Sequence, residues 1–228
     1  MQWIVIDGGS KDGTVELLNS TQDSRLTWIS EPDAGQSAAI NKGLAMATGQ
    51  VVAWLNCDDL YKPGALAAVA DAFAANPAAQ WLVGGCDLID KDSHEVRRGV
   101  TSYKQRRLGS FNFKALLRMN MISQPAVFWR NEFGKTVGPL DQSLHWTMDY
   151  DLWLRMAGHC PPLVLDRVLA SFRVHGASKS RGGARAQFRE GYRVACRYAQ
   201  ADRLSRVAHR LNVERIVWAY HAMRLIGK

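Results

Sequence analysis

The sequence predicts an α/β protein with a mostly parallel sheet flanked by helices. In the first half of the chain, short β-branched or apolar runs alternate with stretches of good helix formers, which is the order of consecutive βαβ units. Acidic side chains directly follow two of the predicted strands. Because ligands of parallel sheets bind outside the carboxyl ends of the strands, the sequence predicts a ligand site at this edge.

The first four predicted strands lie at 3–6, 26–29, 51–55 and 81–89. The first stops at Asp-Gly-Gly-Ser and the second at Glu-Pro-Asp-Ala-Gly, both of which are turn sequences. The third is continuously apolar, so we expect it to be buried on both faces. Helices are predicted at 14–18, at 36–46 before Gly49, and from Pro63 to about 75, where proline suits a first helical turn.

The second half of the chain is less regular. Residues 92–110 are basic and polar and predict a loop, whereas 125–129 and 168–174 predict strands and 149–156 a helix. From 184 on, the pattern is helical and rich in arginine. Residues 181–228 carry eleven Lys or Arg and three acidic side chains, which accounts for the whole net charge of +8. We therefore divide the chain into a domain at 1–180 and a basic helical extension at 181–228.

Length and composition restrict the class of protein. The chain has 228 residues, 47% of them apolar and 22% charged, which suits one folded core and excludes a disordered or collagen-like chain. No apolar run is long enough to cross a membrane, and the first residues lack the pattern of a signal peptide. The four cysteines form no CxxC pair, so we interpret them as reduced thiols. These features predict a cytoplasmic protein.

Two acidic segments follow predicted strands. Asp58 and Asp59 are adjacent carboxylates, which suit Mg²⁺ or Mn²⁺ bridging a diphosphate; alternatively they form an ordinary turn in which Asp59 caps the next helix. The segment from Asp7 to Thr14 contains glycines that let the backbone approach a ligand, and Asp7 can accept a hydrogen bond from a nucleoside. It is neither a dinucleotide nor a P-loop motif, and a tight turn is the alternative interpretation.

Two further segments carry ionisable side chains. Asp149 and Asp151 open a predicted helix, where an acid can act as a general base or simply complement the helix dipole. Residues 172–180 gather Arg, His and Lys within a few positions, which suits a diphosphate clamp or a third metal ligand; a solvated basic loop is the alternative.

Together, four segments resemble one family in the order in which they occur. They cover about residues 3–180 and read IVIDGGSKDGT, ISEPDAGQSAAINKGLAMATGQVVAWLNCDD, SQPAVFWRNEFGKTVGPLDQSLHWTMDYDLWLRM and FRVHGASKS. These segments resemble the signatures of family 2 glycosyltransferases of the GT-A fold, a Rossmann-like α/β fold. The resemblance implies an inverting transferase that uses a nucleotide-activated sugar and a divalent metal, Mn²⁺ or Mg²⁺.

The resemblance also implies roles for individual residues. Asp149 matches the catalytic base, and Asn56-Cys57-Asp58-Asp59 stands at the DxD motif. Nucleotide binding is implied for Asp7, Asp33, Asn56 and Asp58, diphosphate binding for His175 and Lys179, metal binding for Asp59 and Asp58, and a place in the sugar or acceptor cleft for Gln124 and Trp153.

The sequence departs from the family pattern in two ways. Gly8, Met148 and Asn56 stand where many members have acidic residues. Members of the family also begin with a central strand and a helix before the strand at 3–6, so the resemblance predicts that this chain lacks both. The absence of that strand would leave unpaired backbone groups and uncovered apolar surface on its neighbours.

The basic extension has three interpretations. Arg181, Arg185, Arg189, Arg193 and Arg197 recur every four residues and form one helical stripe. Such a helix suits a peripheral contact with the inner face of the plasma membrane, or a solvated face packed on the domain. Nucleic-acid binding is the third use of such charge, but no known motif accompanies it, so we expect no nucleic-acid partner.

The sequence therefore predicts a hexosyltransferase-type enzyme. It would transfer a sugar from a UDP- or GDP-sugar to a glycan or lipid-linked acceptor in polysaccharide, lipopolysaccharide or other glycan biosynthesis of the bacterial type. The alternative is a catalytically inactive glycosyltransferase-like module that binds a partner or a membrane. A sugar nucleotidyltransferase ranks last, because the glycine-rich phosphate loop that it needs is missing.

Overall fold

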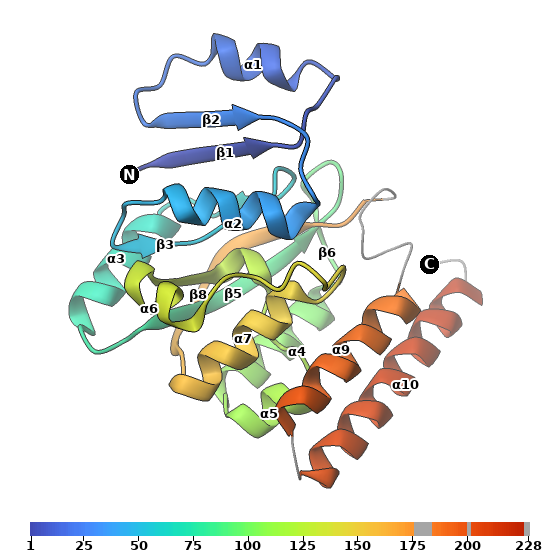
Figure 1. Cartoon of the computed structure of the whole chain (residues 1–228). Helices are drawn as coiled ribbons and strands as arrows, with labels where there is room; N and C mark the ends of the chain where they lie inside the picture. Colours follow the sequence, from blue (N-terminus) through green and yellow to red (C-terminus); the bar gives the residue numbers. More distant parts are fainter. Residues whose placement is uncertain (176–183, 200–201, 226–228) are drawn as a thin grey trace.

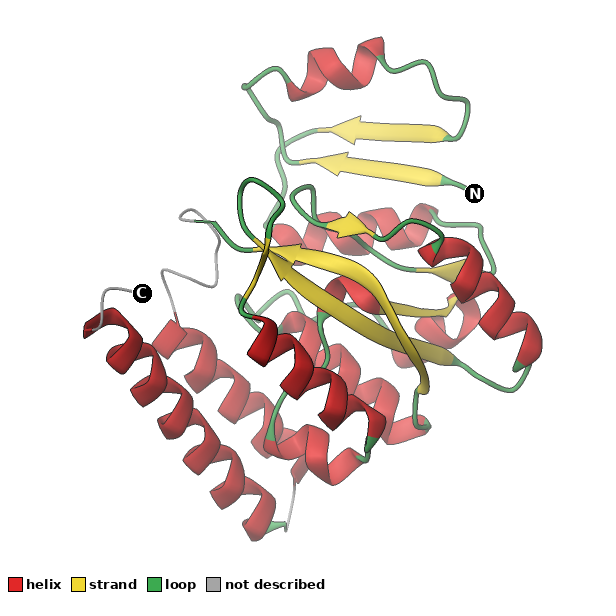
Figure 2. Cartoon of the chain, turned by 180° about the vertical axis from the view of Figure 1, so that it is seen from behind, coloured by secondary structure: helices red, strands yellow, loops and turns green. Residues whose placement is uncertain are grey.

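The computed structural model describes residues 1–175, 184–199 and 202–225, with the backbone alone at 184 and 216–225. A curved six-stranded sheet forms its centre, with helices on both faces (Figure 1, Figure 2). A smaller two-stranded sheet lies beyond it. The predicted α/β fold class is confirmed.

The small sheet is formed by β1 (Trp3–Asp7) and β2 (Leu26–Ser30), which run parallel and are connected through α1 (Thr14–Ser20). This is the βαβ unit that the sequence predicts. In the described part of the chain, no ladder joins this unit to the large sheet. The next helix, α2 (Gln36–Met46), packs on β1 so closely that a Cβ at Gly43 would lie 3.3 Å from Ile6 Cγ1. It separates the two sheets (Figure 1).

The large sheet is mixed rather than mostly parallel. Its strand order is β3-β7-β5-β8-β4, with β6 paired to β5, and only the β5–β8 pair is parallel. The prediction of a parallel sheet assumed that a crossover helix precedes each strand. Instead β7 follows a 3₁₀ turn, η1 (Gln124–Ala126), and runs antiparallel to β5. The strands are β3 (Val51–Val52), β4 (Leu60–Tyr61), β5 (Trp81–Ile89), β6 (Glu95–Val96), β7 (Val127–Arg130) and β8 (Leu163–Arg173).

Alternating side chains of β5 divide the core into two layers. Leu82 packs with Val69 and Phe73 of α3 (Ala65–Ala75) on one face, whereas Trp81 and Val83 belong to a larger cluster on the other. That larger cluster draws on α5 (Phe113–Arg118), α7 (Met148–His159) and α9 (Ala184–Ala199). The short helix α6 (Asn131–Val137) follows β7 and packs against it.

Two glycines of β5 allow close packing on both sides. A Cβ at Gly84 would collide with Leu169 of β8, and one at Gly85 would collide with Gln105 of α4 (Arg98–Gly109). The β5–β8 register also shifts at this point. Gly84 therefore allows the close approach of β8, and Gly85 allows that of α4.

Two predicted elements are wrong. The expected loop at 92–110 contains β6 and the helix α4. Among the residues of α4 only Leu108 is buried, so its pattern lacks the apolar stripe that would have indicated a helix. The expected strand at 51–55 pairs only over β3, because the chain leaves the sheet after Val52. Trp54 then turns into the core while Leu55 is exposed.

The basic extension forms α9 and α10 (Arg203–Leu225), which lie side by side (Figure 1). Val194, Ala195 and Ala199 of α9 enter the large core cluster. On α10, His209 Nδ1 lies 2.7 Å from the carbonyl oxygen of Leu117. The extension is thus packed on the rest of the chain, and the division at 180 stays a prediction. Among the helices that the structure describes, none combines the length and the apolar character needed to span a bilayer.

Candidate functional site

A large cavity of about 3140 Å³ runs between β1 and α2 on one side and the large sheet with α4 and α7 on the other. Its walls are apolar near β1 and become polar toward the carboxyl end of β8. The acidic segment after β3, the first turn of α7 and the end of β8 all contribute side chains to it. The predicted residues that line it are Asn56, Asp58, Asp59, Gln124, Asp149 and His175.

Asn56 holds the acidic segment in place through its side-chain amide. Its Nδ2 donates to Asp59 Oδ2 and to Gln124 Oε1, both at 3.0 Å, and its Oδ1 accepts from Gln36 Nε2 at 3.0 Å. Gln124 in turn donates to the carbonyl oxygen of Trp54 at 2.7 Å. An aspartate could not donate these two hydrogen bonds, so the amide at this position has a structural use.

The two adjacent carboxylates have different environments. Asp59 is 3% exposed, and its Oδ1 accepts from the backbone N–H of Arg173 at 2.9 Å. Burial raises the pKa of Asp59 to about 6. The Asp58 side chain is 36% exposed, and its Oδ2 lies 3.0 Å from His175 Nε2. Asp58 and His175 thus present two potential metal ligands at the cavity. Asp59 instead holds the acidic segment in place through its hydrogen bonds with Asn56 and Arg173.

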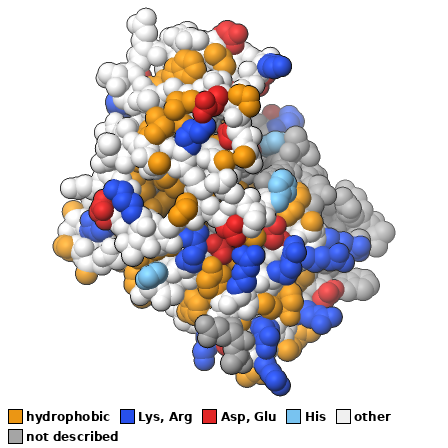
Figure 3. Space-filling view, in the orientation of Figure 1, with side chains coloured by type: hydrophobic (Ala, Val, Ile, Leu, Met, Phe, Trp, Pro, Cys, Tyr) orange, Lys and Arg blue, Asp and Glu red, His pale blue; other side chains and the backbone are white. Residues whose placement is uncertain are grey.

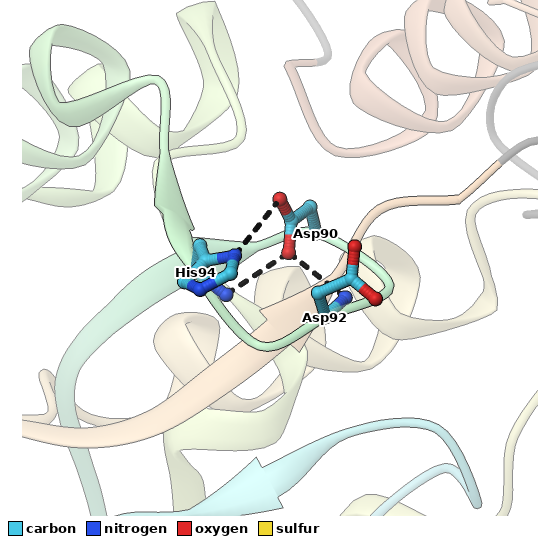
Figure 4. A group of neighbouring side chains, drawn as sticks. All are labelled: Asp90, Asp92 and His94. Atoms are coloured by element: carbon cyan, nitrogen blue, oxygen red, sulfur yellow. Dashed lines mark hydrogen bonds and ion pairs between the residues drawn. The ribbon is translucent and has the colours of Figure 1, made fainter.

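Arg173 connects this segment to the hairpin between β5 and β6. Its Nε donates to the carbonyl oxygen of Asp58 at 2.9 Å, and its Nη1 donates to that of Asp90 at 2.7 Å. The hairpin contains a second group of potential metal ligands, Asp90, Asp92 and His94 (Figure 4). The carboxylate of Asp90 accepts the backbone N–H groups of Asp92 and His94, each at 2.9 Å, so it already shapes the turn.

Asp149 lies in the first turn of α7 and lines the cavity. Its Oδ1 accepts from the N–H of Tyr150 at 2.7 Å. Burial raises the pKa of Asp149 to about 6, and the nearby ammonium group of Lys104 opposes that rise. Lys104 lines the same cavity from α4 and donates to Ser123 Oγ at 3.2 Å. Sequence reasoning missed Lys104, because it lies in the segment predicted to be a loop.

Glu190 of α9 holds the turn that leads into α7 and was also missed. This buried carboxylate accepts from the backbone N–H groups of His145, Trp146 and Thr147 at 3.1, 2.6 and 2.8 Å, and from Thr147 Oγ1 at 2.9 Å. Thr147 is the N-cap residue of α7 and the other two donors lie in the turn before it, so Glu190 fixes the segment that leads into the helix, and its negative charge beside the first turn complements the helix dipole. The extension therefore positions the helix that carries Asp149. Because these contacts join residues more than 40 positions apart, no local pattern predicts them.

Replacing Glu190 with glutamine is expected to lower the free energy of unfolding by about 2–3 kcal/mol, because the amide turns one acceptor into a donor that faces N–H groups. Chemical denaturation measures the change. Glu132→Gln is the matched control, since that side chain is 84% exposed and its loss should cost less than about 0.5 kcal/mol. Equal effects of the two substitutions would contradict the role of Glu190 in holding the turn before α7.

Asp7 and Asp33 lie outside the residues that line the cavity. Hydrogen bonds from the hydroxyls of Ser10 and Ser30 and from nearby backbone N–H groups lower the pKa of Asp7 to about 2. This carboxylate therefore shapes its own turn. Asp33 lies beside that turn, since a Cβ at Gly8 would be 3.5 Å from Asp33 Oδ2, and its Oδ1 is buried without a hydrogen-bond partner. Nucleoside contacts by Asp7 and Asp33 stay predictions.

The expected place of Trp153 in the cleft is wrong. Its side chain has no exposed surface and stacks on Trp54 and Trp81 at centroid distances of 5.5 and 6.3 Å. Trp153 lies on the face of α7 that is turned to the core, whereas Asp149, four positions earlier, borders the cavity. Gln124 does line the cavity. Lys179 lies outside the described residues.

Comparison with known proteins assigns the chain to a family. The family model described as glycosyl transferase family 2 matches residues 1–131. The PGL/p-HBAD biosynthesis glycosyltransferase of Mycobacterium bovis is 31% identical over 180 residues, covering 76% of this chain and 65% of that relative. An uncharacterized glycosyltransferase of Mycobacterium tuberculosis is 28% identical over 184 residues, covering 79% and 66%. The chain thus spans less than two thirds of the length of either relative.

Solved structures share the fold. TarS of S. aureus in complex with UDP-GlcNAc superposes with a TM-score of 0.66 at 14% identity, covering 88% of this chain and 58% of TarS. The mannosyltransferase PcManGT of Pyrobaculum calidifontis, in complex with GDP-Man and Mn²⁺, superposes with a TM-score of 0.62 at 16% identity, covering 98% and 71%. The predicted GT-A fold is confirmed, and the chain belongs to glycosyltransferase family 2.

Proposed function

We propose that the chain transfers a hexose from a nucleotide-diphospho-sugar to a hydroxyl acceptor with inversion, in the assembly of a polysaccharide, lipopolysaccharide or other glycan. The observation that carries this proposal is the one cavity lined by Asp58, His175 and Asp149. A base that takes the acceptor proton and a cation that neutralises the leaving diphosphate both favour a direct displacement at a sugar carbon. The UDP-GlcNAc and GDP-Man in the two solved structures support a UDP- or GDP-sugar donor.

Asp58 and His175 suit a divalent cation better than Asp59 does. A carboxylate oxygen and an imidazole nitrogen 3.0 Å apart form a donor set that Mn²⁺ accepts, and Mg²⁺ is the alternative. Both carboxylate oxygens of Asp59 already accept hydrogen bonds, and the side chain is buried. The proposal therefore assigns Asp58 to the metal and leaves Asp59 a supporting role. A bound cation would neutralise charge on the departing nucleoside diphosphate.

Asp149 is proposed to act as the general base. Its carboxylate would take the proton of the acceptor hydroxyl while that oxygen bonds to the anomeric carbon and the bond from this carbon to the diphosphate breaks. Burial makes it a stronger base than a solvated aspartate. Its first-turn position on α7 keeps it at the cavity wall, and Glu190 fixes the turn that leads into this helix.

Asp58→Asn is expected to remove the Mn²⁺-dependent part of nucleotide affinity, because an amide oxygen carries no charge for the cation. Calorimetric titration of UDP and GDP, with and without Mn²⁺, measures it. Asp92→Asn is the matched control: it alters the other group of potential ligands and should leave the Mn²⁺ dependence unchanged. If Asp92→Asn abolishes the dependence and Asp58→Asn does not, the proposed cation site is wrong.

The rate of transfer is expected to rise with pH and level off above about pH 6. Asp149 acts as a base only when ionised, and its pKa is about 6, so below this pH the rate should fall about tenfold per unit. Since Lys104 lowers the pKa of Asp149, Lys104→Met should move the acid limb of kcat/KM to higher pH. Lys91→Met, at an exposed lysine, is the control. An unmoved limb in Lys104→Met would assign it to another group.

A second candidate function is nucleotide-sugar binding without catalysis. It is favoured by the separation of the β1–β2 unit from the large sheet, since no ladder joins them in the described part of the chain. Nucleotide release from UDP- and GDP-sugars in the presence of Mn²⁺ distinguishes the two functions. Release that requires Asp149 supports the transferase, whereas Mn²⁺-dependent binding without any release supports the binding module.

A further inference from the structure

The side of α10 that faces away from the core carries exposed aliphatic side chains. Leu204, Val207 and Leu211 are 77%, 57% and 60% exposed. Their spacing of three and four positions places them in one stripe along the helix. Ser205 and His209 lie on the opposite side and are buried against the rest of the chain. A solvent-exposed apolar stripe on the side of a helix opposite its buried face indicates a surface that a partner covers.

A second stripe of arginines runs beside the first. Arg203, Arg206 and Arg210 each precede one of the aliphatic residues by one position, and together with Val207 and Leu211 they line a shallow groove of about 430 Å³. One carboxylate, Glu214, lines the same groove. Lys and Arg side chains also gather over the lower half of the view in Figure 3, where Figure 1 draws α9 and the helices beside it.

We propose that the outer face of α10, formed by Arg203, Leu204, Arg206, Val207, Arg210 and Leu211, binds the surface of an anionic phospholipid bilayer. The aliphatic stripe would enter the boundary between headgroups and acyl chains, and the arginines would contact lipid phosphates. A nucleic acid would leave the aliphatic stripe in water. A second copy of this face would bring the arginines of both copies together.

The position of this face relative to the cavity gives the contact a use. Asn212 and Arg215 of the same helix line the cavity that also contains Asp149. α10 therefore contributes to the cavity wall next to the residues that would touch the bilayer. This use rests on the proposed function: a lipid-linked acceptor held in the membrane would have its sugar or phosphate end close to the cavity mouth.

Flotation of the full chain with vesicles tests the proposal. Vesicles of phosphatidylcholine alone are compared with vesicles containing about one third phosphatidylglycerol, at low and high salt. Arg203→Gln/Arg206→Gln/Arg210→Gln should weaken binding about 100-fold, at about fivefold per arginine. Leu204→Ser/Val207→Ser/Leu211→Ser should weaken vesicle binding at both low and high salt. The matched control, Lys11→Gln/Lys91→Gln/Arg106→Gln, removes the same charge from exposed positions elsewhere.

Binding that requires phosphatidylglycerol, weakens with salt and is lost in both α10 variants but not in the control supports the proposal. The proposal is overturned if the wild-type chain does not float with the vesicles, or if the control loses binding equally. It is also overturned if the α10 variants change their oligomeric state without a change in flotation. Calorimetry with UDP and GDP on the same variants tests the proposed function separately, because none of the six substituted residues of α10 lies among those assigned to the cation or the base.

Discussion

Asp149→Asn is expected to lower kcat for sugar transfer by about 10²–10⁴-fold while leaving the affinity for nucleotide unchanged. The amide cannot take the proton of the acceptor, and general-base catalysis typically contributes a factor of this size. Single-turnover transfer assays give the rate, and calorimetry gives the affinity. The binding data matter because a loss of both would indicate a disturbed cavity rather than a missing base.

A second readout distinguishes a catalytic Asp149 from a structural one. The pKa of Asp149 is raised on folding to about 6, so at neutral pH its charge opposes folding. Asp149→Asn should therefore unfold at the same temperature as wild type or higher. Asp71→Asn, at an exposed position of α3, should change neither rate nor stability. Transfer that continues at the wild-type rate in Asp149→Asn would exclude this residue as the base.

Trp153→Ala is expected to lower the free energy of unfolding by about 3–5 kcal/mol, because it opens a cavity where the indole has no exposed surface. Trp153→Phe should cost less, since it keeps an aromatic ring and removes an indole N–H that has no hydrogen-bond partner in the structure. Chemical denaturation measures both substitutions.

Trp3→Ala provides the control for this prediction. Trp3 is 46% exposed, so its loss should cost about 1 kcal/mol or less. If Trp153 lined the sugar cleft instead, Trp153→Phe would weaken binding of the nucleotide-sugar with little change in stability. The structure predicts the opposite pattern: reduced stability and unchanged affinity.

Local sequence patterns predicted the elements whose signals are local. The alternation of β-branched runs and helix formers located β1, β2, α2 and β5 within one or two residues. Strand direction is not a local property, so the strand at β7 was predicted but its antiparallel direction was missed. The helix α4 was missed for a different reason: it is held against β5 by the close approach at Gly85 rather than by an apolar stripe of its own.

The candidate site shows the same limit. Asp58, Asp59, Gln124, Asp149 and His175 were placed by motif resemblance, and the structure brings all five to one cavity. Resemblance alone could not separate the roles of the two adjacent carboxylates, because burial, not sequence, distinguishes them.

Lys104 and Glu190 were missed because each acts on Asp149 from a distant part of the chain. Trp153, one helical turn after Asp149 on α7, was assigned to the cleft by the family resemblance alone, which does not reveal how deeply a side chain is buried. Here the core covers the later turn.

Trp54 belongs to both the core and the cavity. It stacks on Trp153, meets Trp129 edge to face at 5.6 Å, and lines the cavity beside Asn56. The excitation energy of any of these neighbouring indoles can transfer to Trp54, which borders the cavity. The molecule thus carries a built-in optical reporter, whose ultraviolet emission should change when a nucleotide enters, without any attached dye.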